Sequence, residues 1–146
     1  MLQRFEQFTL MLARINRYVH NIEDMEMRKF GLKRGSVHCL LVLSMHPEGL
    51  TAAQLSLYCE TDKAAISRLV THLKQEGLIN RNREQNYRAP LVLSEKGLQI
   101  ASTVREKVLW AVSKAGEGLA EDERAILYKS FDIVAENLKT ICEKEI

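Results

Sequence analysis

The sequence predicts a mainly α-helical protein with one small β-hairpin, set between long helices at the two ends of the chain. Apolar residues recur at helical steps of three and four through most of the 146 residues. That period changes once, at about residues 78–93, where two short apolar runs flank a polar stretch as in a hairpin. The low content of 7 glycines and 2 prolines excludes a loop-dominated chain.

The composition is that of an ordinary globular protein, with 46% hydrophobic and 27% charged residues. The longest unbroken apolar run, residues 39–43, is too short to cross a bilayer, and the first residues contain no leader-like stretch. The three cysteines, Cys39, Cys59 and Cys142, form no CxxC pair, which is typical of reduced thiols. We therefore expect a cytoplasmic protein with no membrane partner.

Residues 2–29 are predicted to form one long helix. Its apolar residues follow a heptad-like spacing through Phe5, Phe8, Leu12, Ile15, Val19 and Ile22. The end of the chain repeats this pattern in two helices, the first beginning after Ser94 and the second near residues 121–123. Apolar stripes at both ends of the chain favour dimerisation through residues 1–32 and 98–146. The alternative is that the first helix packs on the last two helices of the same chain.

The middle of the chain begins with a helix from about residues 33–36 to residue 45, which the turn at Pro47 ends. Thr51 and Gln54 then have the spacing of a capping box, which predicts a short helix to about residue 58.

A further helix follows at about residues 62–77, with a cap oxygen from Thr61 or Asp62 and a left-handed end at Gly77. Its core-facing residues are Ile66, Leu69, Val70 and Leu73. Residues 78–93 form the predicted hairpin, in which Pro90 confines the returning strand to an edge or to its own start.

Two helices joined by a tight turn and followed by a basic hairpin are the plan of a winged helix-turn-helix, predicted here over residues 33–97. The positive charge supports this interpretation, because residues 61–97 carry seven basic and four acidic side chains. On the recognition helix we expect DNA contacts from Asp62, Lys63, Ala64, Ala65, Ser67, Arg68, Thr71 and His72. On the wing we expect them from Arg81, Arg83 and Arg88, through the minor groove.

The chain resembles the MarR family of bacterial transcription regulators. The matching stretches are residues 50–55, 62–70 and 73–79 with Arg81, and 93–97. The resemblance implies a homodimer that binds a palindromic operator on double-stranded DNA, with half-sites about one DNA turn apart. It also implies a role as a ligand-responsive repressor. The wing reads Asn86-Tyr87-Arg88 where the family usually has Asp-x-Arg, so the charge pairing of that arginine is missing.

An effector is expected from the resemblance, and Tyr18, His38 and Trp110 are the candidates for a pocket between the first, second and fifth helices. The alternative is that these three are packing residues. No enzyme motif, metal-ligand spacing or cofactor motif occurs, so we expect no catalytic residues, no metal and no cofactor. Two other functions stay open, a winged-helix protein-interaction module without DNA binding and a redox-responsive regulator.

Overall fold

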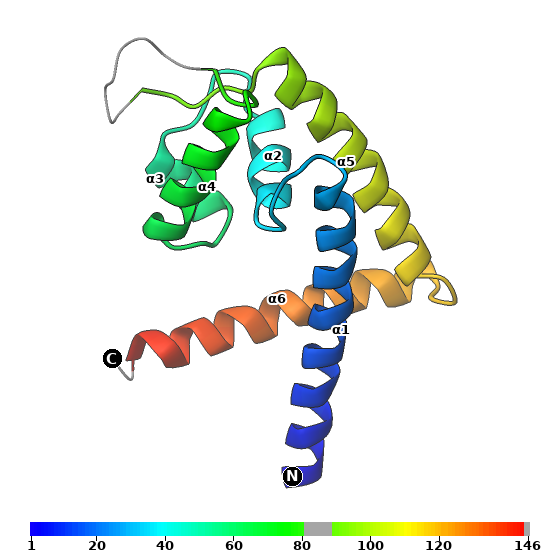
Figure 1. Cartoon of the computed structure of the whole chain (residues 1–146). Coiled ribbons are helices and arrows are strands. Elements are labelled where there is room, and N and C mark those ends of the chain that lie inside the picture. Colours follow the sequence, from blue (N-terminus) through cyan, green and yellow to red (C-terminus); the bar gives the residue numbers. More distant parts are fainter. Residues whose placement is uncertain (81–88, 145–146) are drawn as a thin grey trace. The chain divides into compact units, whose positions relative to one another are not determined.

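The computed structural model describes residues 1–80 and 89–144 (Figure 1). It divides into two units, residues 1–107 and residues 108–146, and each is described by itself. In the described residues the chain forms these helices: α1 (Leu2–Arg28), α2 (Ser36–Ser44), α3 (Ala52–Tyr58), α4 (Lys63–Gln75), α5 (Glu95–Ala115) and α6 (Glu121–Lys144). The prediction of a mainly helical protein is confirmed.

Helix α1 is the long helix that the heptad-like spacing predicts, and Met27 is its one buried residue. The apolar stripe of α1 stays largely open to solvent. Phe5 is 63% exposed and Ile15 is 47% exposed in the single chain. The first unit therefore leaves this stripe uncovered along most of the helix.

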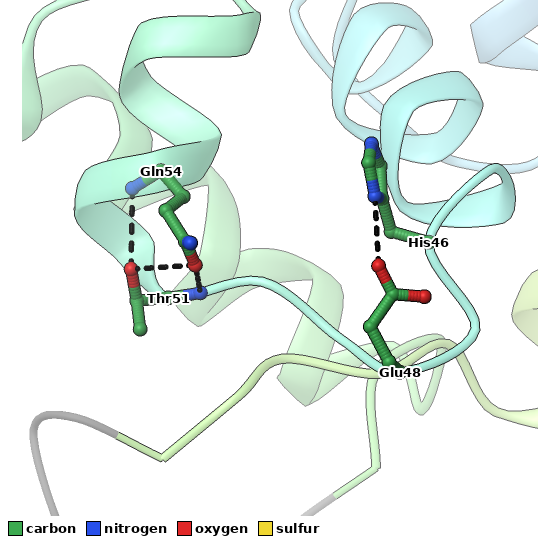
Figure 2. A network of polar contacts seen from close by, with 4 residues as sticks. All are labelled: His46, Glu48, Thr51 and Gln54. Carbon is green, nitrogen blue, oxygen red and sulfur yellow. Dashed lines mark hydrogen bonds and ion pairs between the residues drawn. The ribbon is translucent and has the colours of Figure 1, made fainter.

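The helices in the middle of the chain begin where the sequence signals place them. Helix α2 begins at Ser36, so Lys33 and Arg34 precede it and do not oppose its dipole from within the first turn. Thr51 and Gln54 form the predicted capping box (Figure 2). The Thr51 amide donates to Gln54 Oε1 at 2.9 Å, and the Gln54 amide donates to Thr51 Oγ1 at 3.2 Å.

The turn before this box is held by a second polar contact, between His46 Nδ1 and Glu48 Oε1 at 3.0 Å (Figure 2). A hydrogen bond to its own backbone amide and the contact with His46 lower the pKa of Glu48. Together the two contacts fix the path of the chain from α2 into α3.

Antiparallel pairing closes the helical cluster on one side. Ile79 pairs with Leu93, and the Asn80 amide donates to the Val92 carbonyl at 2.9 Å. Leu50 also pairs with Leu91, with amide–carbonyl distances of 3.1 and 2.7 Å, a contact that the sequence did not predict. The tip of the predicted wing, residues 81–88, lies outside the described residues, so the wing stays a prediction.

The core of the first unit lies among the end of α1, α2, α3, α4, the paired segments and the start of α5. Its most enclosed large side chains are Met27, Leu40, Leu43, Leu55, Ile66, Leu73, Leu78 and Ile79. Ser94 caps α5 as predicted, since its Oγ accepts from the Gly97 amide at 3.1 Å. The same hydroxyl donates to the Gly77 carbonyl at 2.6 Å, which ties the end of α4 to the start of α5.

The second unit contains the end of α5 and the whole of α6. Glu123 Oε2 accepts from the Ala120 amide at 2.7 Å, and Arg124 donates to the Gly116 carbonyl at 2.9 Å. No residue of α6 is buried, so its apolar stripe is uncovered in this chain. None of the helices in the described part combines the length and apolar content needed to span a lipid bilayer.

Candidate nucleic-acid interface

The start of α4 is fixed by a side-chain cap. Asp62 Oδ1 accepts a hydrogen bond from the Ala65 amide at 2.9 Å, which satisfies one of the backbone donors that a helix start leaves free. This carboxylate was predicted as a DNA-contacting residue, and the structure uses it inside the protein to set where the recognition helix begins. Lys63 is then the first helical residue and lies exposed beside the cap.

The outward face of α4 carries polar and basic side chains and one alanine. Its exposed members are Lys63, Ala64, Ser67, Arg68, Thr71 and Gln75. The opposite face buries Ile66, Val70 and Leu73 in the core, so the helix cannot rotate without exposing them. The periodicity therefore places five of the predicted contact residues on one accessible surface, namely Lys63, Ala64, Ser67, Arg68 and Thr71.

The hydroxyl of Thr71 has a defined hydrogen-bonding role. It donates to the Ser67 carbonyl one turn earlier, at 2.9 Å, so its proton is used within the helix. Its oxygen can still accept a hydrogen bond, and in the major groove the matching donors are the amino groups of adenine and cytosine. Arg68 lies between these two residues in sequence and supplies donors only.

Ala65 and His72 are also predicted to contact DNA, but both side chains are half-buried and not openly exposed. The Nε2 atom of His72 is buried and has no hydrogen-bond partner among the described residues. A buried polar nitrogen without a partner is unusual and calls for a ligand or water to satisfy it. The three predicted wing contacts, Arg81, Arg83 and Arg88, lie outside the described residues.

A cavity of about 640 Å³ lies beside α4, a size that suits a small organic molecule. It is lined by Asp24, Arg28, Leu32, Lys33, Arg34, Gly35, His38, Thr61, Ala65, Arg68, Leu69 and His72. These residues come from the end of α1, the segment before α2, α2 itself, the turn between α3 and α4, and α4. The cavity thus lies between the end of α1 and α4, the helices predicted from the sequence to serve dimerisation and DNA recognition.

Basic side chains dominate the charge of this cavity. Arg28, Lys33, Arg34 and Arg68 face a single acidic residue, Asp24, whose carboxylate lies 3.8 Å from Arg34. His38 is paired outside this set, with Nε2 3.3 Å from Glu23. Within the part of the chain that the structure describes, no ion-pair partner is found for Arg28, Lys33 or Arg68. The cavity is therefore suited to an anion.

Of the three residues predicted for an effector pocket, His38 lines this cavity. Tyr18 is exposed on α1 and lies against the Arg17 guanidinium, 5.0 Å from the ring centroid. Trp110 belongs to the second unit. A pocket formed by all three stays a prediction.

Sequence reasoning missed Lys33 and Arg28 as site residues. Lys33 also lines a shallow groove of about 340 Å³ on the outer side of α4, together with Ser67, Arg68, Thr71, His72 and Gln75. In the sequence it is one of two adjacent basic residues near the start of a predicted helix, which does not mark it as a site residue. Its proximity to α4 depends on how the α1–α2 segment packs, which no local pattern reveals.

Comparison with known proteins gives one family. Residues 30–86 match the model of the MarR family. A search with the sequence among curated proteins gives no match.

Several solved structures share the fold. A MarR family transcriptional regulator from Listeria monocytogenes complexed with 26mer DNA is 23% identical, with 87% of this chain and 85% of that chain covered and a TM-score of 0.76. A MarR transcriptional regulator from Methanosarcina mazei Go1 is 21% identical, with 93% and 92% covered and a TM-score of 0.78. CouR from Rhodococcus jostii RHA1 bound to p-coumaroyl-CoA is 18% identical, with 88% and 91% covered and a TM-score of 0.76.

Proposed function

This chain carries a MarR-family segment in residues 30–86, and on that premise we propose that it is a sequence-specific DNA-binding transcription regulator. The observation that carries the proposal is the exposed face of α4, which presents Arg68 together with two hydroxyl side chains, Ser67 and Thr71. A helix fits the major groove, and side chains of this kind distinguish base edges there. The regulator from Listeria monocytogenes, which has this fold, is complexed with DNA.

The proposed active species is a homodimer that acts as a repressor on a palindromic operator. The uncovered apolar stripes of α1 and α6 support a second copy of the chain as their partner. A helix in water is stabilised when its apolar stripe is buried against another helix. A twofold dimer presents two copies of α4, and half-sites about one turn apart would match them. We propose that the wing arginines Arg81, Arg83 and Arg88 add minor-groove contacts.

Replacing Arg68 by alanine should flatten base selectivity at one position of each half-site. A guanidinium that forks onto a guanine edge contributes about 1–3 kcal/mol of discrimination. The test is to select a binding sequence from a random duplex pool with the unmodified protein, then to measure affinities for that duplex and its single-base variants.

Arg14→Ala is the matched control, since Arg14 is an exposed arginine on α1 outside the recognition helix. It should leave selectivity unchanged. Unaltered base preference in Arg68→Ala would refute the readout role of this residue. Failure of the unmodified protein to bind duplex DNA in low salt would favour a protein-interaction module instead, because phosphate contacts are strongest in low salt.

We further propose that the effector is an organic anion that enters the cavity beside α4. The excess of basic residues selects for negative charge, and Leu32, Leu69 and Ala65 supply apolar contact for a ring or chain. Arg68 lines this cavity and also belongs to the outward face of α4. An anion bound to it would compete with DNA for the same guanidinium.

An aromatic carboxylate should therefore release DNA where its neutral amide does not. We suggest cinnamate against cinnamamide as a pair of nearly equal shape, with binding measured by calorimetry and DNA release by fluorescence anisotropy. Arg28→Gln should weaken carboxylate binding about tenfold or more, as expected for loss of a charged partner, and should leave DNA affinity nearly unchanged. Equal potency of acid and amide would contradict the proposed anion selectivity.

A further inference from the structure

Cys39 and Cys59 are twenty residues apart in the sequence, and the fold brings their sulfur atoms to 4.0 Å from each other. Cys39 lies on α2 and is fully buried, whereas Cys59 is half-buried and directly follows the last residue of α3. The sequence indicated unpaired thiols because it contains no CxxC spacing. The structure therefore adds a pair of facing thiols that local spacing does not reveal.

We propose that Cys39 and Cys59 form a reversible disulfide that weakens DNA binding. The effect on DNA rests on the proposed function, whereas disulfide formation does not. A disulfide bond is about 2 Å long, so closing the bond requires the sulfur atoms to approach by roughly 2 Å. Rotation of the two side chains, together with the backbone at the end of α3, would have to supply that movement.

The two thiols have different chemical roles in this proposal. The contact with the Cys39 thiol lowers the pKa of Cys59, although partial burial opposes this shift. The same contact, together with burial, raises the pKa of Cys39. Cys59 is therefore the thiol that ionises first and that solvent can reach, and Cys39 is the thiol poised to react second.

The oxidant is a hydroperoxide. The Cys59 thiolate attacks one oxygen of the peroxide, the O–O bond breaks, and the leaving oxygen takes up a proton, which gives a sulfenic acid and an alcohol or water. The Cys39 sulfur then attacks the Cys59 sulfur, so that the S–S bond forms and the S–O bond breaks. The hydroxyl group leaves with the Cys39 proton as water. Two thiols are oxidised and one hydroperoxide is reduced, and a dithiol reductant reverses the change.

The segment after Cys59 transmits movement directly to α4. Glu60 has a φ of 48°, a left-handed conformation that costs energy in a residue other than glycine. Thr61 Oγ1 donates to the Cys59 carbonyl at 2.9 Å, and Ser56 Oγ donates to the Thr61 carbonyl at 2.5 Å. Asp62, the cap of the recognition helix, comes next. A shift at Cys59 therefore alters the hydrogen-bonded turn that sets the start of α4.

The experiment uses the full chain in a Cys142→Ser background, because Cys142 is exposed and could link two chains. Stoichiometric hydrogen peroxide should produce one intramolecular disulfide, located by peptide mass mapping and removed by dithiothreitol. Affinity for a mixed-sequence duplex in low salt should fall about tenfold on oxidation, within the usual range of coupling between sites, and should return on reduction.

Cys59→Ser and Cys39→Ala, each with its melting curve recorded, are the test variants. Either variant that folds should keep its DNA affinity in peroxide. The absence of a Cys39–Cys59 peptide link would overturn the proposal, and so would a link that leaves DNA affinity unchanged. If the reduced protein fails to bind DNA while the disulfide still forms, the proposed function fails and the thiol chemistry stands.

Discussion

A charge placed in the stripe of α1, as in Ile15→Glu, should separate the proposed dimer and weaken operator binding by about a hundredfold or more. Two DNA-binding segments joined in one dimer bind about 10²–10⁴ times more tightly than a single segment, and separation of the dimer removes that gain. Ile15 is 47% exposed in the single chain, at the middle of the stripe, so the substitution costs little in the monomer. In a helix-to-helix interface the buried carboxylate would be expensive.

Gln7→Glu is the matched control for this prediction. It introduces the same charge on the same helix, at an exposed position two residues after Phe5 and outside the heptad-like stripe. Light scattering after size-exclusion chromatography gives the mass, and titration of the selected duplex gives the affinity. An Ile15→Glu protein that keeps both the mass of a dimer and full affinity would place the dimer contact elsewhere.

Features that depend on neighbouring residues could be predicted from the sequence. The capping box at Thr51 and Gln54, the cap at Asp62 and the left-handed end at Gly77 are all present, the last with a φ of 74°. Each of these is decided within a few residues, where backbone donors and acceptors must be satisfied locally. The bounds of α3 and α4 consequently agree with the prediction to within one or two residues.

Features that join distant segments could not be predicted. The pairing of Leu50 with Leu91 depends on how α3 and α4 fold back, and neither segment alone indicates it. The cavity beside α4 takes its charges from α1, from the segment before α2 and from α4. The approach of Cys39 to Cys59 has the same origin, because α2 and α3 must pack before the two sulfur atoms meet.

Replacing Gly97 by alanine should lower the free energy of unfolding by about 3 kcal/mol, at the upper end of the usual cost of overpacking. A Cβ atom at this position in α5 would overlap the Leu78 carbonyl oxygen and would lie 3.2 Å from Leu93 Cδ2. The Leu78 carbonyl accepts the Ser94 amide at 2.9 Å, so it cannot move away without breaking that bond. Urea denaturation followed by circular dichroism measures the loss.

Gly116→Ala is the control, because a Cβ there meets only the flexible end of the Arg124 side chain, at 3.1 Å. That variant should stay within about 0.5 kcal/mol of the unmodified protein, as surface substitutions usually do. The Gly97 substitution also bears on function, since Leu78 and Leu93 lie in the paired segments that precede and follow residues 81–88 in the sequence and that form the base of the proposed wing. DNA affinity measured well below the melting temperature should therefore fall in Gly97→Ala even where the protein is folded. Full affinity in that folded variant would show that the position of this base is unimportant for binding, and would weaken the proposed role of the wing.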